Sequence, residues 1–179
     1  TVGTSTEVYD HLKLLFARIG RTFSPVSGRE VKRDTMEDVV AGANAFPKES
    51  TVLLMSPIHP PDGRSLREHL DVLQQQGFAR VHDGSSVQRI EDLLIEKKLA
   101  EGPWSLVLDR ITVDPGNSET EGRVADSAET AFFEGQGACM LLGEDAEGKP
   151  LQRNFSDRFE LDGITFEEPT PNFFSFNDP

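Results

Sequence analysis

The sequence contains one cysteine in 179 residues, so the chain can form no disulfide bond with itself. It also contains no apolar run near the roughly 20 residues that span a bilayer, and its first residues lack the basic and apolar segments of a secretory signal. Cys139 lies in the apolar run from Ala138 to Leu142, and we expect it to be a small core residue. A reducing, cytoplasmic setting without membrane contact fits these absences.

Positive charge is also scarce. The chain has 18 lysines and arginines against 31 aspartates and glutamates, which gives a formal net charge of -13. A surface with this balance repels phosphate backbones at distances up to the Debye length. We therefore do not expect this chain alone to bind DNA tightly.

The common catalytic motifs are missing. No G-x-x-x-x-G-K-[ST] sequence is present to cradle nucleotide phosphates, and neither G-x-G-x-x-G nor G-x-S-x-G occurs. No two histidines have the i, i+4 spacing of a helical zinc site; they are His11, His59, His69 and His82. The acidic pairs at 91–92 and 167–168 flank no pocket motif, so we expect solvated surface there. These features favour a binding or scaffold module without a catalytic site of its own.

The length permits a self-sufficient fold. A chain of this size buries roughly 70% of its unfolded surface and needs neither a metal nor a disulfide to fold. The missing initiator methionine before Thr1 and the abrupt end at Pro179 suggest an excised part of a longer protein.

Helices are predicted where apolar residues recur at every third or fourth position. The predicted helical ranges are 4–19, about 34–43, 65–76 and about 124–132. Thr4 and Ser65 each stand three residues before a glutamate, which is the spacing of a capping box at the start of a helix.

Strands are predicted over shorter apolar or alternating stretches, at 51–55, 78–82, 104–111 and 138–142. Asp83 and Gly84 form a favoured hairpin turn, and the stretch 87–99 fits either a strand or a helix. Strands and helices that do not alternate strictly favour an α+β fold, with a mixed or antiparallel sheet covered by helices. Breaks near 21–34 and near 150 predict a middle unit inserted into a small flanking unit formed by the two chain ends.

Motifs along the whole chain resemble those of the UvrA family, the damage-sensing ATPases of bacterial nucleotide excision repair. The first residues read TVGTSTEVYD and continue to LLFARIG, similar to the family's T-V-G-T-x-T-E-I-x-D-x-L-R-L-L-F-A-R. Residues 173–179 read FFSFNDP, similar to F-S-F-N-x-P. Residues 107–110 resemble the family's V-V-D-R strand, and residues 123–131 resemble its R-L-x-x-S-x-E-T-A helix.

The resemblance implies three segments. Residues 1–21 would be a helix of the first signature domain, residues 22–151 the inserted UvrB-binding domain, and residues 152–179 a further signature-domain segment. The parent would be a homodimeric ABC-type ATPase that binds ATP and zinc elsewhere, surveys DNA and loads UvrB at lesions. For this chain, the resemblance implies UvrB and the rest of UvrA as partners, DNA contact only through the parent, and no cofactor of its own.

Two arginines match the family's docking face by motif, Arg80 in the Gly-Phe-x-Arg stretch and Arg110 at the end of V-L-D-R. Exposed guanidinium groups on adjacent strands suit a partner that carries carboxylates. Strand alternation places Arg110 on the same face as Trp104, Leu106 and Leu108. We therefore expect Arg110 to reach solvent at the end of its strand.

The chain departs from the family at two cysteine knuckles. Many members carry Cys-Pro-x-Cys-Gly-like pairs, whereas this chain has SPVSG at 24–28 and FELDG at 159–163. The four ligand positions are Ser24, Ser27, Phe159 and Asp162, which cannot make a tetrahedral thiolate site. We expect the two segments to pack together through apolar burial in place of metal bonds. The residues expected to do so are Phe23, Val26, Phe159 and Leu161.

An accessory DNA-contacting module is the alternative function. Lys97 with Lys98, or the group Arg29, Lys32 and Arg33, could touch phosphates. The family loop that aligns with 59–64 is usually rich in lysine, but here it reads HPPDGR, so DNA contact from this loop is in doubt.

Overall fold

The computed structural model describes residues 2–96, 98–99 and 102–170, and it divides the chain into two compact units. One unit contains residues 1–33 and 158–179, and the other contains residues 34–157. Because both chain ends belong to the first unit, the second unit is an insertion, as predicted. The structural divisions fall at 33/34 and 157/158, whereas the sequence-based segments divide at 21/22 and 151/152.

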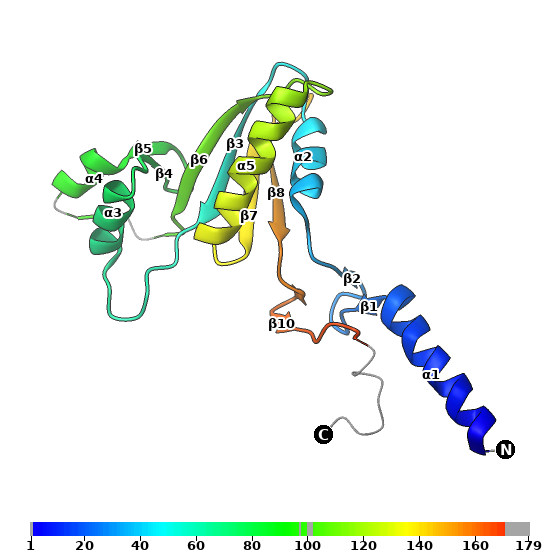
Figure 1. The fold of residues 1–179 in the computed structure, drawn as a ribbon. Coiled ribbons are helices and arrows are strands. Elements are labelled where there is room, and N and C mark those ends of the chain that lie inside the picture. The colour runs from blue at the N-terminus through cyan, green and yellow to red at the C-terminus, as the bar shows by residue number, and fades with distance from the viewer. Residues whose placement is uncertain (1, 97, 100–101, 171–179) are drawn as a thin grey trace. The chain divides into compact units, whose positions relative to one another are not determined.

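The inserted unit is built on a six-stranded antiparallel sheet, with strand order β5-β4-β6-β3-β7-β8 (Figure 1). The predicted α+β fold class is confirmed. The central strands follow from long apolar stretches, and the edge strand β8 closes a hairpin with β7. The strands are β3 (Thr51–Pro57), β4 (Arg80–His82), β5 (Val87–Arg89), β6 (Ser105–Thr112), β7 (Ala138–Glu144) and β8 (Pro150–Ser156).

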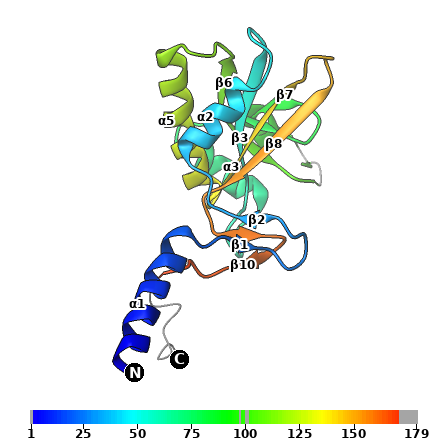
Figure 2. The same cartoon turned by 90° about the vertical axis from the view of Figure 1, so that its right-hand side faces the viewer.

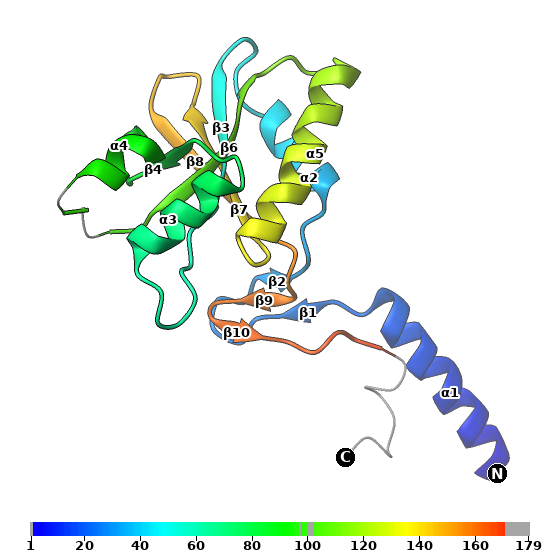
Figure 3. The same ribbon diagram turned by 60° about the vertical axis from the view of Figure 1, so that its left-hand side comes forward.

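The helices of this unit cover one face of the sheet. They are α2 (Met36–Asn44), α3 (Leu66–Gln75), α4 (Ile90–Ile95) and α5 (Ser118–Glu134). The helices α2 and α5 lie side by side (Figure 3). Capping boxes begin α2 at Thr35 and α3 at Ser65. In each, the side-chain hydroxyl accepts a hydrogen bond from the N3 amide, and the N3 carboxylate accepts one from the backbone amide of the cap residue.

Two buried clusters fill the space between sheet and helices. The first joins Leu54, Ile111 and Leu141 of the sheet to α2 and α5, and the second joins Val81 and Leu106 to α3 and α4. Leu108 packs against both clusters, which places all of these helices on the same face. The opposite face carries no helix of the described unit.

Cys139 is buried in the first cluster, as predicted. Burial, together with the negative charges of Asp34 and Asp157, raises the pKa of its thiol to about 12. The thiol therefore stays protonated at neutral pH and behaves as a small apolar side chain.

The stretch 87–99, which the sequence left open between a strand and a helix, begins as a strand and continues as a helix. The strand β5 pairs with β4 through the Asp83-Gly84 turn, and α4 starts directly after it. Asp83 accepts hydrogen bonds from the amides of Ser85 and Ser86, which lowers the pKa of its carboxyl well below the usual range. The hairpin thus pairs three residues on each side of the turn, and the chain forms a helix directly after the last paired residue, Arg89.

The flanking unit contains α1 (Val2–Ile19) and two short hairpins, β1 (Thr22–Phe23) with β2 (Glu30–Val31) and β9 (Glu160–Leu161) with β10 (Ile164–Thr165) (Figure 2). The predicted cap at Thr4 is wrong, because the helix already includes Val2 and Gly3. The apolar residues that recur at helical spacing along α1 are 44–67% exposed in this chain: Val8, Leu12, Leu15, Phe16 and Ile19. Among the described residues, no helix combines the length and apolar character needed to cross a bilayer.

The turn from α5 into β7 depends on a glycine. A β-carbon at Gly135 would lie 2.0 Å from the carbonyl oxygen of Ala138 and 2.9 Å from that of Ala131. Backbone atoms cannot move aside without distorting the turn, so Gly135→Ala should lower the free energy of unfolding by about 2 kcal/mol. Chemical denaturation followed by circular dichroism measures this change.

Gly122 is the matched control, because it lies within α5, which Gly135 caps, and a β-carbon there meets no atom within 4 Å. Gly122→Ala should be neutral or stabilise by up to about 1 kcal/mol, since alanine favours the helix. Equal denaturation midpoints for the two variants would contradict this account of the turn.

Candidate partner-binding face and terminal knuckle

The helix-free face of the sheet contains a hollow of about 880 Å³. Arg80 of β4 and Arg110 of β6 both line it, and both side chains are exposed. The structure therefore brings together the two arginines singled out in the sequence. Both are carried by strands of one hydrogen-bonded sheet, which fixes their relation to each other.

Arg110 reaches this face because β6 contains a bulge. Leu54 of β3 pairs with Asp109, but the next residue, Met55, pairs with Val107, so Leu108 has no partner across the ladder. One extra residue reverses the alternation of side chains beyond it. The expectation that Arg110 shares a face with Leu106 and Leu108 is therefore wrong, and Arg110 instead pairs with Leu53 on the open face.

The two guanidinium groups have no hydrogen bond or ion pair with any residue of the described chain. Other arginines of the inserted unit differ: Arg123 binds Asp109, Arg89 binds Glu91, and Arg67 donates to the carbonyl oxygens at the end of α4. Unpaired guanidinium forks keep all of their donors available for an incoming carboxylate.

The floor of the hollow is apolar, which the sequence reasoning missed. Leu53, Val107 and Leu142 are half-buried and line it together with the two arginines. They come from three adjacent strands, and only the register of the sheet brings them together. Glu144, at the end of β7, adds one acidic group to the lining.

Three of the four knuckle positions named in the sequence analysis, Ser24, Ser27 and Asp162, meet through hydrogen bonds. The hydroxyls of Ser24 and Ser27 each donate to Oδ2 of Asp162 at 2.5 Å, and Arg29 donates to Oδ1 at 3.1 Å. The Asp162 side chain is only 15% exposed. Hydrogen bonds from Ser24, Ser27 and Arg29 lower the pKa of its carboxyl, so it is ionised at neutral pH.

Apolar burial does not hold these segments together as expected. Phe23 is 52% exposed and Val26 is 70% exposed, while Phe159 packs edge-to-face on Phe166 with ring centroids 6.4 Å apart. The sequence reasoning failed here because an aspartate carboxylate can gather three donors at the point where a thiolate would hold a metal. Within the described residues, no group of three or more His, Cys, Asp or Glu side chains could hold a metal ion.

Asp162 is delivered to the cluster by a tight turn. Asp162 and Gly163 have φ values of 54° and 77°, and they connect β9 to β10. A two-residue turn with both φ values positive favours Asp-Gly, which explains the sequence at this point.

The basic groups of the alternative DNA-contacting function are partly occupied. Arg29 is bound to Asp162, and Arg33 forms an ion pair with Glu168 at 2.7 Å. Lys98 is exposed, and Lys97 lies outside the described residues.

Comparison with known proteins identifies the family of the inserted unit. A family model described as the UvrA interaction domain matches residues 34–145, which begin at the first residue of the inserted unit and include Arg80 and Arg110. The chain belongs to this family.

Full-length relatives extend the similarity to the flanking unit. The chain is 33% identical over 184 residues to the UvrABC system protein A of Clostridium perfringens and 35% identical over 187 residues to that of Bacillus subtilis. The corresponding protein of Thermus thermophilus is 31% identical over 183 residues. Each match covers 100% of this chain but only 18–19% of the relative, so the chain spans about a fifth of the length of these proteins.

Membership in the UvrA interaction domain family accounts for the motif matches within 34–145. Residues 107–110 lie in β6 and residues 123–131 lie in α5, as their resemblance implies. The terminal FFSFNDP motif lies outside the described residues.

The hydrogen-bonded knuckle predicts that Asp162→Ala exposes the amides of Ser24 and Gly28, which donate within the first segment to Arg29 and Ser24. Their hydrogen-exchange protection, measured by NMR, should fall, while that of the inserted unit stays unchanged. Glu167→Ala removes an exposed carboxylate of the same unit and serves as the control. A chelator should change none of these rates, and chelator-induced exchange would contradict a metal-independent knuckle.

Acid should have the same effect as the substitution. The folded pKa of Asp162 lies below its ordinary value of 3.8, so the cluster stabilises the unit above that value. Protection at Ser24 and Gly28 should be lost as the pH falls through the lowered pKa. Loss of protection already between pH 5 and 7 would be inconsistent with this assignment.

Proposed function

We propose that this chain acts in nucleotide excision repair as the partner-docking part of a UvrA-type protein, and that the open face around Arg80 and Arg110 binds UvrB. The observation that carries the proposal is that two guanidinium groups line one hollow without a partner among the described residues, on the face that no described helix covers. Family membership supplies the biological setting.

The chemistry of the face favours an acidic partner surface. Two cationic forks held by a sheet can each bind one carboxylate in bidentate fashion, and such pairs fix orientation as well as adding affinity. The half-buried Leu53, Val107 and Leu142, which line the same hollow, would add the burial of an apolar partner side chain. The rest of the chain is strongly negative, so the two arginines direct an acidic partner to this face rather than elsewhere.

ATP hydrolysis, DNA contact and the loading of UvrB are proposed for the longer parent protein. We propose that the parent is a homodimeric ABC-type ATPase that contacts DNA and loads UvrB at lesions, because the chain is similar along its whole length to UvrABC system protein A. The P-loop motif is absent from this sequence, so ATP hydrolysis would be carried by other parts of the parent.

Charge reversal tests the docking face. Arg80→Glu and Arg110→Glu should each weaken binding of this chain to purified UvrB by at least about tenfold, which corresponds to about 1.4 kcal/mol. Each substitution places a carboxylate opposite the acidic surface proposed for UvrB, so that like charges repel. Binding of the unaltered chain should weaken as salt increases. Isothermal titration calorimetry at two salt concentrations gives both results.

Arg64→Glu is the matched control, since it makes the same change in net charge on an exposed loop outside the hollow. It should bind UvrB as the unaltered chain does. Unchanged affinity in the Arg80→Glu, Arg110→Glu double variant would remove this face from the interaction.

The accessory DNA-contacting function makes a different prediction. If it were correct, the isolated chain would bind duplex DNA at physiological salt, and Arg33→Glu would abolish that binding. We expect no saturable increase in fluorescence anisotropy of a labelled duplex at micromolar chain concentrations, because of the net charge of -13 and the Arg33–Glu168 pair.

A further inference from the structure

We propose that Asp109, Arg123 and Ser127, on the helix-covered side of the sheet, are positioning residues that hold Arg110 toward UvrB. The proposal rests on the docking function proposed above and adds residues that do not line the hollow. These three residues belong to β6 and α5, and together we call them the buttress.

The buttress binds the backbone of Arg110 on both sides of its α-carbon. Oδ1 of Asp109 accepts a hydrogen bond from the Arg110 amide at 2.7 Å, and the Arg123 guanidinium donates to the Arg110 carbonyl oxygen at 3.3 Å. The side chain of Arg110 is left out of these contacts and faces the hollow.

The buttress is also bound within itself. Arg123 forms a two-pronged ion pair with Asp109, with Nε donating to Oδ2 at 2.7 Å and Nη2 donating to Oδ1. The hydroxyl of Ser127, one turn further along α5, donates to Oδ2 of Asp109 at 3.2 Å. The Asp109 side chain is 13% exposed, so little water competes with these donors.

The sheet explains why Arg110 needs such support. The strand β4 pairs with β6 only at Ser105 and Leu106, so the part of β6 that carries Arg110 has its sheet neighbour on the β3 side. The bulge at Leu108 interrupts that remaining ladder immediately before Asp109. A shift of one residue here would turn the Arg110 side chain to the helix-covered face.

Electrostatics keep the buttress charged. Burial by itself raises the pKa of the Asp109 carboxyl, but hydrogen bonds from Arg123, the Arg110 amide and Ser127 outweigh burial and bring it below its ordinary value. The hydrogen bond to Asp109, together with its negative charge, raises the pKa of Arg123. Both partners are therefore ionised at the pH of a binding experiment.

A double-mutant cycle separates positioning from general destabilisation. Asp109→Asn should weaken UvrB binding by about fivefold or more in the otherwise unaltered chain, but by less than about twofold once Arg110→Ala is present. In an Arg80→Ala background the full effect of Asp109→Asn should remain, because the buttress does not contact Arg80. Calorimetric titration of the full chain with UvrB gives each affinity.

The outcomes distinguish the two proposals. If Arg110→Ala leaves UvrB affinity unchanged, the docking face itself is wrong. If Arg110→Ala weakens binding but Asp109→Asn does not, or weakens it equally in all three backgrounds, only the positioning role is overturned. Should Asp109→Asn fail to fold, Ser127→Ala removes one donor and is measured in the same cycle, with a smaller effect that must likewise disappear with Arg110→Ala.

Discussion

One extra residue in β6 decides which side chains the sheet offers to a partner. Leu108 has no partner on β3, and beyond it Asp109 faces α5 while Arg110 faces the open hollow. If Leu108 were instead paired in an unbroken ladder, simple alternation would place the arginine over the helical core and turn the aspartate to the open face. Because all the helices of the inserted unit cover one face, the side of the sheet that Arg110 takes determines whether it can meet another protein.

The flanking unit also depends on one local set of contacts, which joins its two chain segments. The two chain segments that form it are separated by the whole inserted unit, so something must hold them together after more than a hundred intervening residues. A carboxylate with hydroxyl and guanidinium donors joins them here.

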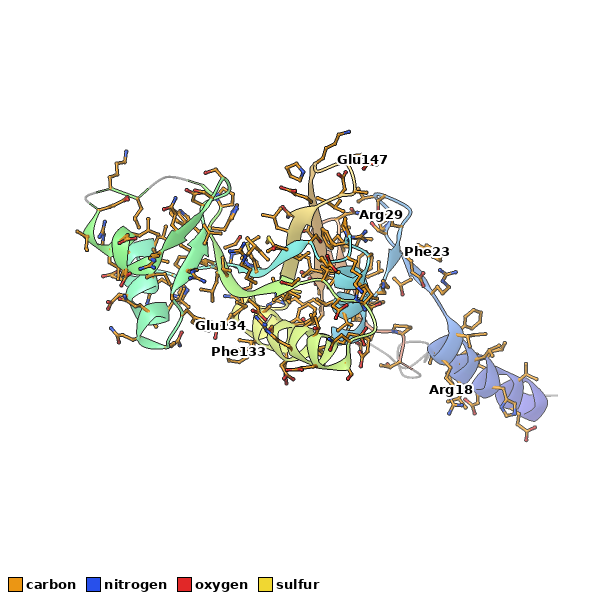
Figure 4. All side chains as sticks on the ribbon, turned by 90° about the horizontal axis from the view of Figure 1, so that it is seen from above. Arg18, Phe23, Arg29, Phe133, Glu134 and Glu147 are labelled. Carbon is orange, nitrogen blue, oxygen red and sulfur yellow. The ribbon has the colours of Figure 1, made fainter. Side chains whose placement is uncertain are left out.

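In the inserted unit, Phe133 and Glu134 at the end of α5 lie next to the turn that Gly135 makes possible (Figure 4).

Local patterns in the sequence predicted most of the fold, and contacts between distant residues explain what they missed. The capping box at Ser65, the strands at 51–55, 104–111 and 138–142, and the buried Cys139 follow from short-range rules and are confirmed. The bulge at Leu108 carries no glycine or turn signal, so simple alternation placed Arg110 on the wrong face. The Ser24–Asp162 contact joins residues 138 positions apart, and the buttress depends on register between β6 and α5. The i, i+4 spacing of Arg123 and Ser127 was its only visible trace in the sequence.

Backbone amide exchange, mapped along this chain with and without UvrB, tests the docking face directly. We expect new protection in β4, in β6 from Val107 to Thr112 and in β3 near Leu53, with little change in α2 and α5. Protection confined to the helix-covered side, or spread evenly over the chain, would contradict the assignment of the open face as the docking surface.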